Sequence, residues 1–194
     1  MGFKPRKTSF RKQKRLYVVS TEGAQTEPTY LGLFTPGRDG EFRLRIIGNP
    51  KHESAPVHVV QRLFDFEKAN KPGTNTEYWA LIDRDSWDET ALSEANRMVR
   101  TRDNFHLAMS NPCFELWLYL HLRENKMFAD RRDCLRSLGE IWPEYKKSGY
   151  DPGYVRDGIA DAIRRAKDLE EDAPGGEPWP TGQGTHVYRL IEKF

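Results

Sequence analysis

Tyr78-Trp79-Ala80-Leu81-Ile82-Asp83-Arg84-Asp85 is the stretch that decides the fold, because an apolar segment typical of a buried strand runs directly into two carboxylates. Alternate residues of an extended chain point the same way, so Asp83 and Asp85 share a face if the strand geometry persists through Arg84. Two like charges this close are stabilised by a cation, and oxygen ligands suit Mg²⁺ or Mn²⁺. The pair therefore predicts a metal site.

Asp85 has a second interpretation, as part of a helix start. Ser86 and Glu89 have the spacing of a capping box, which would open the next helix directly after the strand. Negative charge is favourable near a helix N-terminus, so Asp85 needs no metal to explain it. From these residues alone, a metal site and a helix start both stay open.

Segments typical of strands and helices alternate on both sides of this stretch. Expected strands cover residues 16–20, 42–47, 79–83 and 105–109, and expected helices cover residues 26–34, 56–66 and 87–102. Such alternation predicts the α/β class, with a mainly parallel sheet covered on both faces and right-handed crossovers. Ligands of such sheets bind at the carboxyl ends of the strands. Glu22, Asp83 and Asp85 are expected at that edge, and helix capping alone does not explain three carboxylates there.

The second half of the chain starts with a different pattern. Asn111 and Pro112 are typical of an N-cap followed by proline at the first helical position, and the helix they open is almost wholly apolar. Glu115 lies in its first turn, where an unpaired charge would cost several kcal/mol unless it is ligated, protonated or paired. A helix-dipole contact or an ion pair would also explain Glu115. His121 in the same helix is more typical of a hydrogen-bonded core residue than of a ligand.

The remaining segments predict helices and a connector but no second domain. A helix is expected over residues 131–141, a connector over 142–153, a helix over 155–169, a loop over 172–184 and a last helix around Val187 to Ile191. No repeat or linker divides the chain. We therefore expect a basic arm at residues 1–15 and a single domain at residues 16–194.

Composition excludes several classes of protein. The 194 residues are 37% hydrophobic and 31% charged, and no apolar run approaches the about 18 residues that span a bilayer, so no membrane role is expected. The N-terminus lacks the apolar region of a signal peptide, which argues against export. Cys113 and Cys134, the only cysteines, form no disulfide framework and no metal cluster, and are expected to be reduced and buried in a cytoplasmic protein.

The net charge of +2 hides a basic N-terminal arm. Such an arm binds polyanions through counterion release, so binding to the phosphate backbone of nucleic acid is its functional interpretation. A solvated tail that improves solubility is the alternative. The basic residues of the arm are Lys4, Arg6, Lys7, Arg11, Lys12, Lys14 and Arg15.

The glutamate after the first strand and the D-x-D after a later one resemble the Toprim domain of topoisomerases, primases and OLD-type nucleases. A larger set of motifs is more specific. These motifs are Glu22-Gly23-Ala24-Gln25-Thr26-Glu27, Asp83-Arg84-Asp85, Ser110-Asn111-Pro112-Cys113-Phe114-Glu115-Leu116-Trp117-Leu118, Tyr145-Lys146-Lys147 and Thr185-His186-Val187-Tyr188-Arg189-Leu190-Ile191. Together they resemble the RloB-like family, whose Toprim-related members occur in bacterial restriction and phage-defence loci, and the resemblance covers nearly the whole chain.

The resemblance implies a Toprim-like three-layer sandwich with added C-terminal helices, and a Mg²⁺-dependent nuclease of an anti-phage defence system. It implies control by an ABC-type ATPase encoded nearby, and RNA, with tRNA among the candidates, as a substrate favoured over DNA. Glu22, Asp83 and Asp85 fall on the Toprim acidic motifs. The roles of Glu115 and Lys147 follow from chemistry: a carboxylate can position or deprotonate a nucleophile, and a lysine can neutralise developing charge.

Two other functions compete with nuclease activity. D-x-D after an apolar strand also describes an aspartyl-phosphate phosphatase of the haloacid dehalogenase type, although such enzymes usually carry Thr or Val where Trp87 stands. A non-catalytic module that binds nucleic acid or regulates its ATPase partner would use the same acids for binding or structure. The activating signal, the oligomeric state and the choice between RNA and DNA are not fixed by the sequence.

Overall fold

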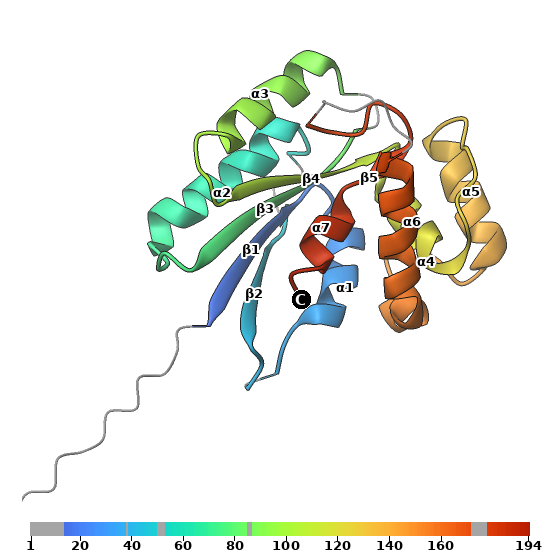
Figure 1. Cartoon of the computed structure of the whole chain (residues 1–194), viewed down its shortest axis with the longest axis horizontal. Helices are drawn as coiled ribbons and strands as arrows, with labels where there is room; N and C mark the ends of the chain where they lie inside the picture. Colours follow the sequence, from blue (N-terminus) through green and yellow to red (C-terminus); the bar gives the residue numbers. More distant parts are fainter. Residues whose placement is uncertain (1–13, 38, 50–52, 85–86, 172–177) are drawn as a thin grey trace, which may run out of the picture.

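A five-stranded sheet forms the centre of the computed structural model, which describes residues 14–37, 39–49, 53–84, 87–171 and 178–194 (Figure 1). The strand order is β2-β1-β3-β4-β5. The first four strands are mutually parallel, and β5 pairs antiparallel with β4. The strands are β1 (Arg15–Thr21), β2 (Phe42–Ile47), β3 (Thr76–Asp83), β4 (Phe105–Asn111) and β5 (Gly184–Thr185).

The central strands are apolar on both faces because helices cover the sheet on both sides. Val18 and Val19 of β1 are fully buried although they point to opposite faces, and β3 is buried over nearly its whole length. One face is covered by α2 (Pro56–Asn70) and α3 (Glu89–Val99). Figure 1 shows both helices on one side of the sheet, at the upper left, with the other α-helices on the opposite side, toward the right.

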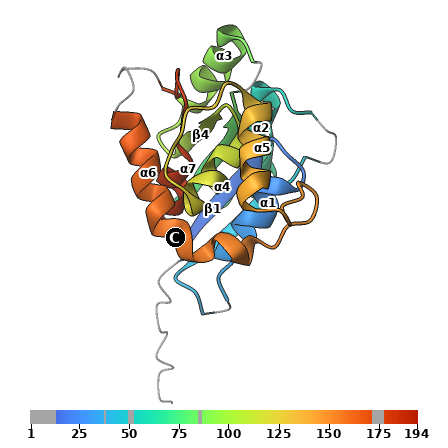
Figure 2. The ribbon, with the colours of Figure 1, turned by 90° about the vertical axis from the view of Figure 1, so that its right-hand side faces the viewer.

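The other face carries a larger set of helices around Trp117, which is fully buried. On this face α1 (Thr26–Leu31), α4 (Phe114–Leu122) and α7 (Val187–Ile191) share a core with the sheet. Helices α5 (Arg131–Ile141) and α6 (Ile159–Glu171) pack against α4, and α6 also contacts β5 (Figure 2). Two short 3₁₀ helices, η1 (Gly32–Phe34) and η2 (Pro152–Gly158), complete the connections. This α/β architecture confirms the expected fold class and is compatible with the Toprim-like sandwich.

Two helix starts differ from the sequence-based expectation. The third long helix begins at Glu89, and its N-cap is Asp88, whose side chain accepts a hydrogen bond from Ala91 N at 2.8 Å. Glu89 is therefore the first helical residue, so it cannot be the third residue of a capping box, and Ser86 lies outside the described residues. The expected helix over residues 87–102 is shorter at both ends.

The prediction for Asn111 and Pro112 was wrong. Asn111 is the last residue of β4, where it pairs with Gly184, and its amide donates hydrogen bonds to the carbonyl oxygens of residues 180 to 182. The helix begins at Phe114 with Cys113 as its N-cap, and the Cys113 side chain makes no capping hydrogen bond.

Strand β5 was expected to be loop, because two residues are too few to show a period of alternation.

The described residues contain no helix that is both long enough and apolar enough to cross a membrane. Cys113 and Cys134 are buried and free of disulfide bonds, as expected. His121 is also a core residue: one ring nitrogen lies 3.0 Å from Tyr30 Oη and the other lies 2.8 Å from the Trp117 carbonyl oxygen. These residues therefore serve packing.

Candidate active site

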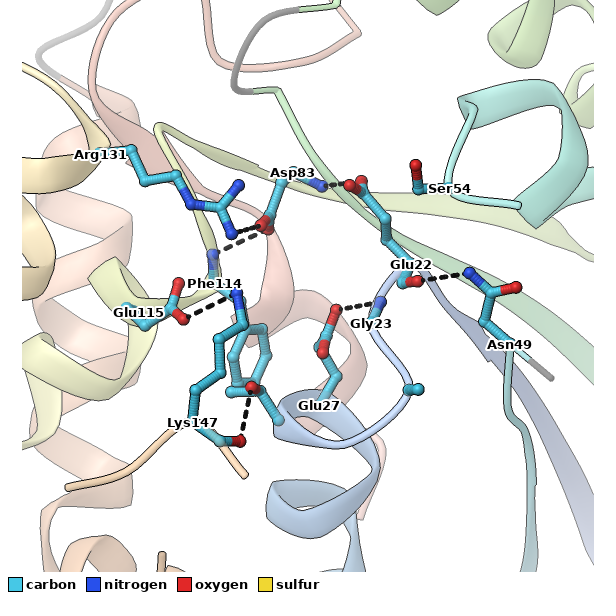
Figure 3. A pocket seen from close by; sticks show the side chains of 12 residues that line it. Glu22, Gly23, Glu27, Asn49, Ser54, Asp83, Phe114, Glu115, Arg131 and Lys147 are labelled. Atoms are coloured by element: carbon cyan, nitrogen blue, oxygen red, sulfur yellow. Dashed lines mark hydrogen bonds and ion pairs between the residues drawn. The ribbon is translucent and has the colours of Figure 1, made fainter. Parts of the chain in front are cut away.

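An acidic cavity of about 210 Å³ lies at the carboxyl edge of the sheet, where β1 and β3 end and α1 and α4 begin (Figure 3). Its charged lining consists of four carboxylates and two cations, which come from five different parts of the chain. Backbone and small polar groups complete the wall. The charged residues are Glu22, Glu27, Asp83, Glu115, Arg131 and Lys147.

Glu22 joins the ends of β1 and β3. Its backbone N–H donates to the Leu81 carbonyl at 3.1 Å, and its Oε2 accepts a hydrogen bond from the Asp83 backbone N–H at 3.1 Å. On the other side, the Asn49 side chain donates to the Glu22 carbonyl at 2.9 Å. Burial raises the pKa of Glu22 to about 7, against the lowering effect of the hydrogen bond from Asp83. Glu22 therefore exchanges a proton near neutral pH.

Asp83, the last residue of β3, caps a helix that lies far from it in sequence. Its Oδ1 accepts a hydrogen bond from the Phe114 backbone N–H at 2.8 Å, which supplies the cap that Cys113 does not provide for α4. Its Oδ2 lies 3.7 Å from Arg131 Nη2. Burial, followed by the charges of Glu27 and Glu22, raises the pKa of Asp83 well above its usual range despite Arg131. The carboxylate is thus held in a strongly negative environment.

Glu27 is a site residue to which the sequence assigned no role. It lies in the first turn of α1, is 4% exposed, and accepts a hydrogen bond from the Gly23 backbone N–H at 2.9 Å. Burial raises its pKa, and the charge of Glu115 adds to this. Glu27 could have been predicted as a site residue, because it belongs to the same motif as Glu22. It also lies at the start of a helix whose next turn is buried.

Glu115 lies on the opposite wall and is 1% exposed. Its Oε1 accepts a hydrogen bond from Tyr145 Oη at 3.2 Å and lies 3.4 Å from Lys147 Nζ, while its buried Oε2 has no hydrogen-bond partner among the described residues. The expected ion pair therefore exists, but it satisfies only one of the two oxygens. Figure 3 shows Glu115 and Lys147 meeting at the cavity.

The connector that carries Lys147 is fixed to α1 by two contacts. Thr26 Oγ1 donates to the Lys147 carbonyl at 3.3 Å, and Tyr150 Oη donates to the Thr26 carbonyl at 2.7 Å. The Lys147 side chain is about half exposed, so it can approach a ligand at the mouth of the cavity. Arg131, from the first turn of α5, and Asn49, after β2, were not predicted, because only the tertiary fold brings them to the cavity.

The oxygen donors of the cavity are of the type that divalent cations bind. The pKa values of Glu22, Glu27 and Asp83 are raised, as they are when carboxylates lack a neutralising cation. Among the described residues, no group of three or more His, Cys, Asp or Glu side chains is arranged to hold a metal ion, because each carboxylate faces a different donor. Asp85, the expected partner of Asp83, lies outside the described residues. The type of donor therefore suits Mg²⁺ or Mn²⁺, while the observed arrangement of the described side chains does not form a metal-binding group.

The expected nucleic-acid arm lies almost wholly outside the described residues, which begin at Lys14. Arg15 is described, and it forms an ion pair of 3.0 Å with Glu77 at the start of β1. That position is at the end of the sheet opposite the acidic cavity. Arg15 therefore joins the starts of β1 and β3 through this ion pair, and its role in nucleic-acid binding stays a prediction.

The family model described as RloB-like protein matches residues 17–194 of this chain. No curated protein and no solved structure matches it. The matched range includes all of the described residues that line the acidic cavity.

Proposed function

This chain belongs to the RloB-like family, and we propose that it is a metal-dependent nuclease that cleaves phosphodiester bonds at the acidic cavity. One observation carries the proposal: three buried carboxylates and the partly buried Glu22 face two cations in a space of about 210 Å³ at the carboxyl edge of a parallel sheet. Buried charge is tolerated where it is compensated, and the missing positive charge is what a divalent cation would bring. Parallel sheets bind their ligands at this edge.

The residues divide into two groups by role. We assign Glu22, Asp83 and Asp85 to binding Mg²⁺ or Mn²⁺, which when bound polarises phosphoryl oxygens and stabilises a leaving alkoxide. Glu115 positions or deprotonates the attacking group, and its Oε2 is suited to this because no described residue bonds to it. Lys147 lies next to Glu115 and is half exposed, so it can neutralise charge on the phosphate.

The substrate and partner remain part of the proposal. Membership in the RloB-like family supports a cytoplasmic role in anti-phage defence, with RNA, including tRNA, preferred over DNA. It also supports control by an ABC-type ATPase encoded nearby.

Cleavage assays test the function directly. The purified protein, with and without the neighbouring ATPase, is incubated with end-labelled tRNA, single-stranded RNA and duplex DNA in Mg²⁺, Mn²⁺ or EDTA. We expect cleavage only with a divalent cation, and a loss of about 100-fold or more in Asp83→Asn. That variant keeps an oxygen acceptor for the Phe114 N–H. Glu124→Gln, which neutralises an exposed carboxylate elsewhere, is the matched control and should cleave normally.

A non-catalytic module is the second candidate, because hydrogen bonds and ion pairs already engage each cavity carboxylate. In that case the protein, with its ATPase, would bind nucleic acid and leave it intact under all metal conditions. Release of phosphate from a phosphomonoester without cleavage of any nucleic acid would favour a phosphatase instead. Either outcome would overturn the nuclease assignment.

A further inference from the structure

A second hollow, which we call the β2 groove, adjoins the acidic cavity. It lies beside the edge strand β2 and the helix α2, and has a volume of about 640 Å³. Ala24 and Asn49 line both the groove and the cavity, so the two spaces are neighbours. A volume between about 300 and 1,000 Å³ is typical of sites for small organic groups, whereas the acidic cavity is smaller. The remaining groove residues used below are Arg45, Ile47, Arg62 and Phe66.

Arg62 places a fixed positive charge in the groove. Its guanidinium donates hydrogen bonds to Ser20 Oγ at 3.2 Å, to the Glu53 carbonyl at 3.0 Å and to the Thr21 carbonyl at 2.7 Å. All three acceptors are uncharged, so hydrogen bonds to neutral groups hold the arginine in place. Burial lowers the pKa of Arg62, and the charges of the nearby Glu53 and Glu22 oppose this effect. A guanidinium has five N–H groups, which leaves donors for an anion.

Arg45 adds a cation that is available to a ligand. It lies on the exposed edge strand, and its side chain forms no hydrogen bond or ion pair with any other residue that the structure describes. Arg43 lies two residues earlier on the same face of β2 and is also exposed, but it does not line the groove. The two arginines therefore have the same charge and lie on the same face of β2, but of these two only Arg45 lines the β2 groove.

The groove also has an apolar wall. Phe66 of α2 and Ile47 at the end of β2 are both partly exposed and line it together. An aromatic ring beside arginines is a surface on which an unpaired base can stack while its phosphate meets the cations. A duplex, whose bases are already stacked and paired, offers no such base.

We propose that the β2 groove binds the unpaired nucleotide next to the scissile phosphodiester, with its base against Phe66 and its phosphate at Arg45 near Arg62. This inference rests on the proposed nuclease function, because it makes the groove the neighbour of the cleavage site. It assigns single-stranded or looped nucleic acid as the substrate class. Phe66 and Arg45, which hold the base and its phosphate, are thus distinct from the charged residues of the acidic cavity.

Binding in EDTA separates this inference from cleavage. Fluorescence polarisation is measured with a labelled single-stranded RNA 12-mer and with the corresponding duplex, for the full chain and its variants. We expect Arg45→Ala to weaken single-strand binding about tenfold, as for loss of a charge-assisted contact, while Arg43→Ala changes it less than about threefold. Phe66→Leu, which keeps the apolar packing and removes the ring, should weaken binding at least about fivefold. Melting temperatures of all three variants check that the fold is intact.

Three outcomes would overturn the inference. Equal losses in Arg45→Ala and Arg43→Ala would mean that only general positive charge matters. Unchanged binding in Arg45→Ala would show that the groove does not bind the substrate. Duplex binding as tight as single-strand binding would show that the groove does not require an unpaired base. Failure of the nuclease function gives a different result, since single-strand binding would keep its Arg45 dependence in EDTA while no cleavage followed in Mn²⁺.

Discussion

Two groups of carboxylates in this protein have opposite electrostatic environments. Around α6, arginines meet the acids directly: Glu124 Oε1 lies 2.7 Å from Arg164 Nη2 and 3.0 Å from Arg165 Nε, and these hydrogen bonds lower the pKa of Glu124. Burial alone would raise the pKa of Glu170, but hydrogen bonds from Tyr188 and Arg189 lower it. In the acidic cavity, by contrast, burial raises the pKa values of Glu22, Glu27 and Asp83.

This difference indicates that the carboxylates of the cavity do not serve only as members of structural ion pairs. Around α6 two arginines bond to the single carboxylate of Glu124, whereas the cavity has two cations for four carboxylates, three of which are buried. Strongly perturbed carboxylates that cluster in a hollow are typical of functional sites. We infer that the cavity acids are kept for a ligand that brings positive charge.

The largest expected effect is on the pH dependence of stability without metal. A carboxyl whose folded pKa is raised binds more protons when folded, so its contribution to stability is present below the ordinary value of 4.5 and is lost as pH rises through about 7 for Glu22. Each pKa unit corresponds to about 1.4 kcal/mol, so Glu22 alone would lower the free energy of unfolding by up to about 3 kcal/mol over this range. Chemical denaturation in EDTA at pH 5 and pH 7.5 measures it.

The controls for this prediction come from both regions. Glu22→Gln should flatten the decline, and saturating Mn²⁺ should offset it by binding the folded state. Glu124→Gln should leave the decline unchanged, because the pKa of Glu124 is lowered and any stability it contributes is lost only as pH falls. A free energy of unfolding that rises from pH 5 to pH 7.5 in EDTA would contradict the raised pKa values.

The next largest effect concerns catalysis at Glu115. Glu115→Gln keeps the shape and the Oε1 acceptor for Tyr145 but removes the charge. We expect cleavage to fall by about 100-fold or more while the melting temperature stays nearly unchanged, in the range typical of losing a positioned catalytic group. Cleavage rates per folded molecule and thermal melts measure the two quantities. Lower stability with preserved cleavage would make Glu115 structural and leave the chemistry to Glu22, Asp83 and Asp85.

The smallest effect is expected from the basic arm. Deleting residues 1 to 14 removes six lysines and arginines, so nucleic-acid binding should weaken about tenfold at low salt, with a shallower dependence of affinity on salt. The arm has few stacking or base-reading groups, so it should add affinity without specificity. Titrations at several salt concentrations compare the two proteins. Identical affinities and salt slopes would support the solubility-tail interpretation.

Much of the fold could be predicted because its signals are local. The apolar run from Tyr78 to Ile82 predicted the central strand, and the alternation of strands and helices predicted that Glu22 and Asp83 lie at one edge of the sheet. In the structure the Asp83 backbone N–H donates a hydrogen bond to the Glu22 side chain. Helix starts were less predictable, because a cap can come from elsewhere in the chain. Asp83, 31 residues away, caps α4 through Phe114, and no local pattern contains that contact.

The site was predicted in part for the same reason. Glu115 and Lys147 were expected, and the structure shows them 3.4 Å apart in the cavity. Arg131 and Asn49 reach the cavity only through the packing of α5 and the end of β2. The sequence around each residue therefore does not predict that it lines the cavity. Glu27 could have been found, since it shares a motif with Glu22. The proposed pairing of Asp83 with Asp85 stays a prediction, because Asp85 lies outside the described residues.

The most direct test of the cation site is a calorimetric titration with Mn²⁺. Asp83→Asn is the informative variant, because alanine would also remove the acceptor of the Phe114 N–H and so disturb α4. The wild-type protein should bind Mn²⁺ near neutral pH with release of protons, because carboxyls with raised pKa values must ionise to bind it. Asp83→Asn should lose the site while retaining its fold, and Glu124→Gln should bind normally. Equal Mn²⁺ affinity in the wild type and Asp83→Asn would contradict a metal site in the acidic cavity.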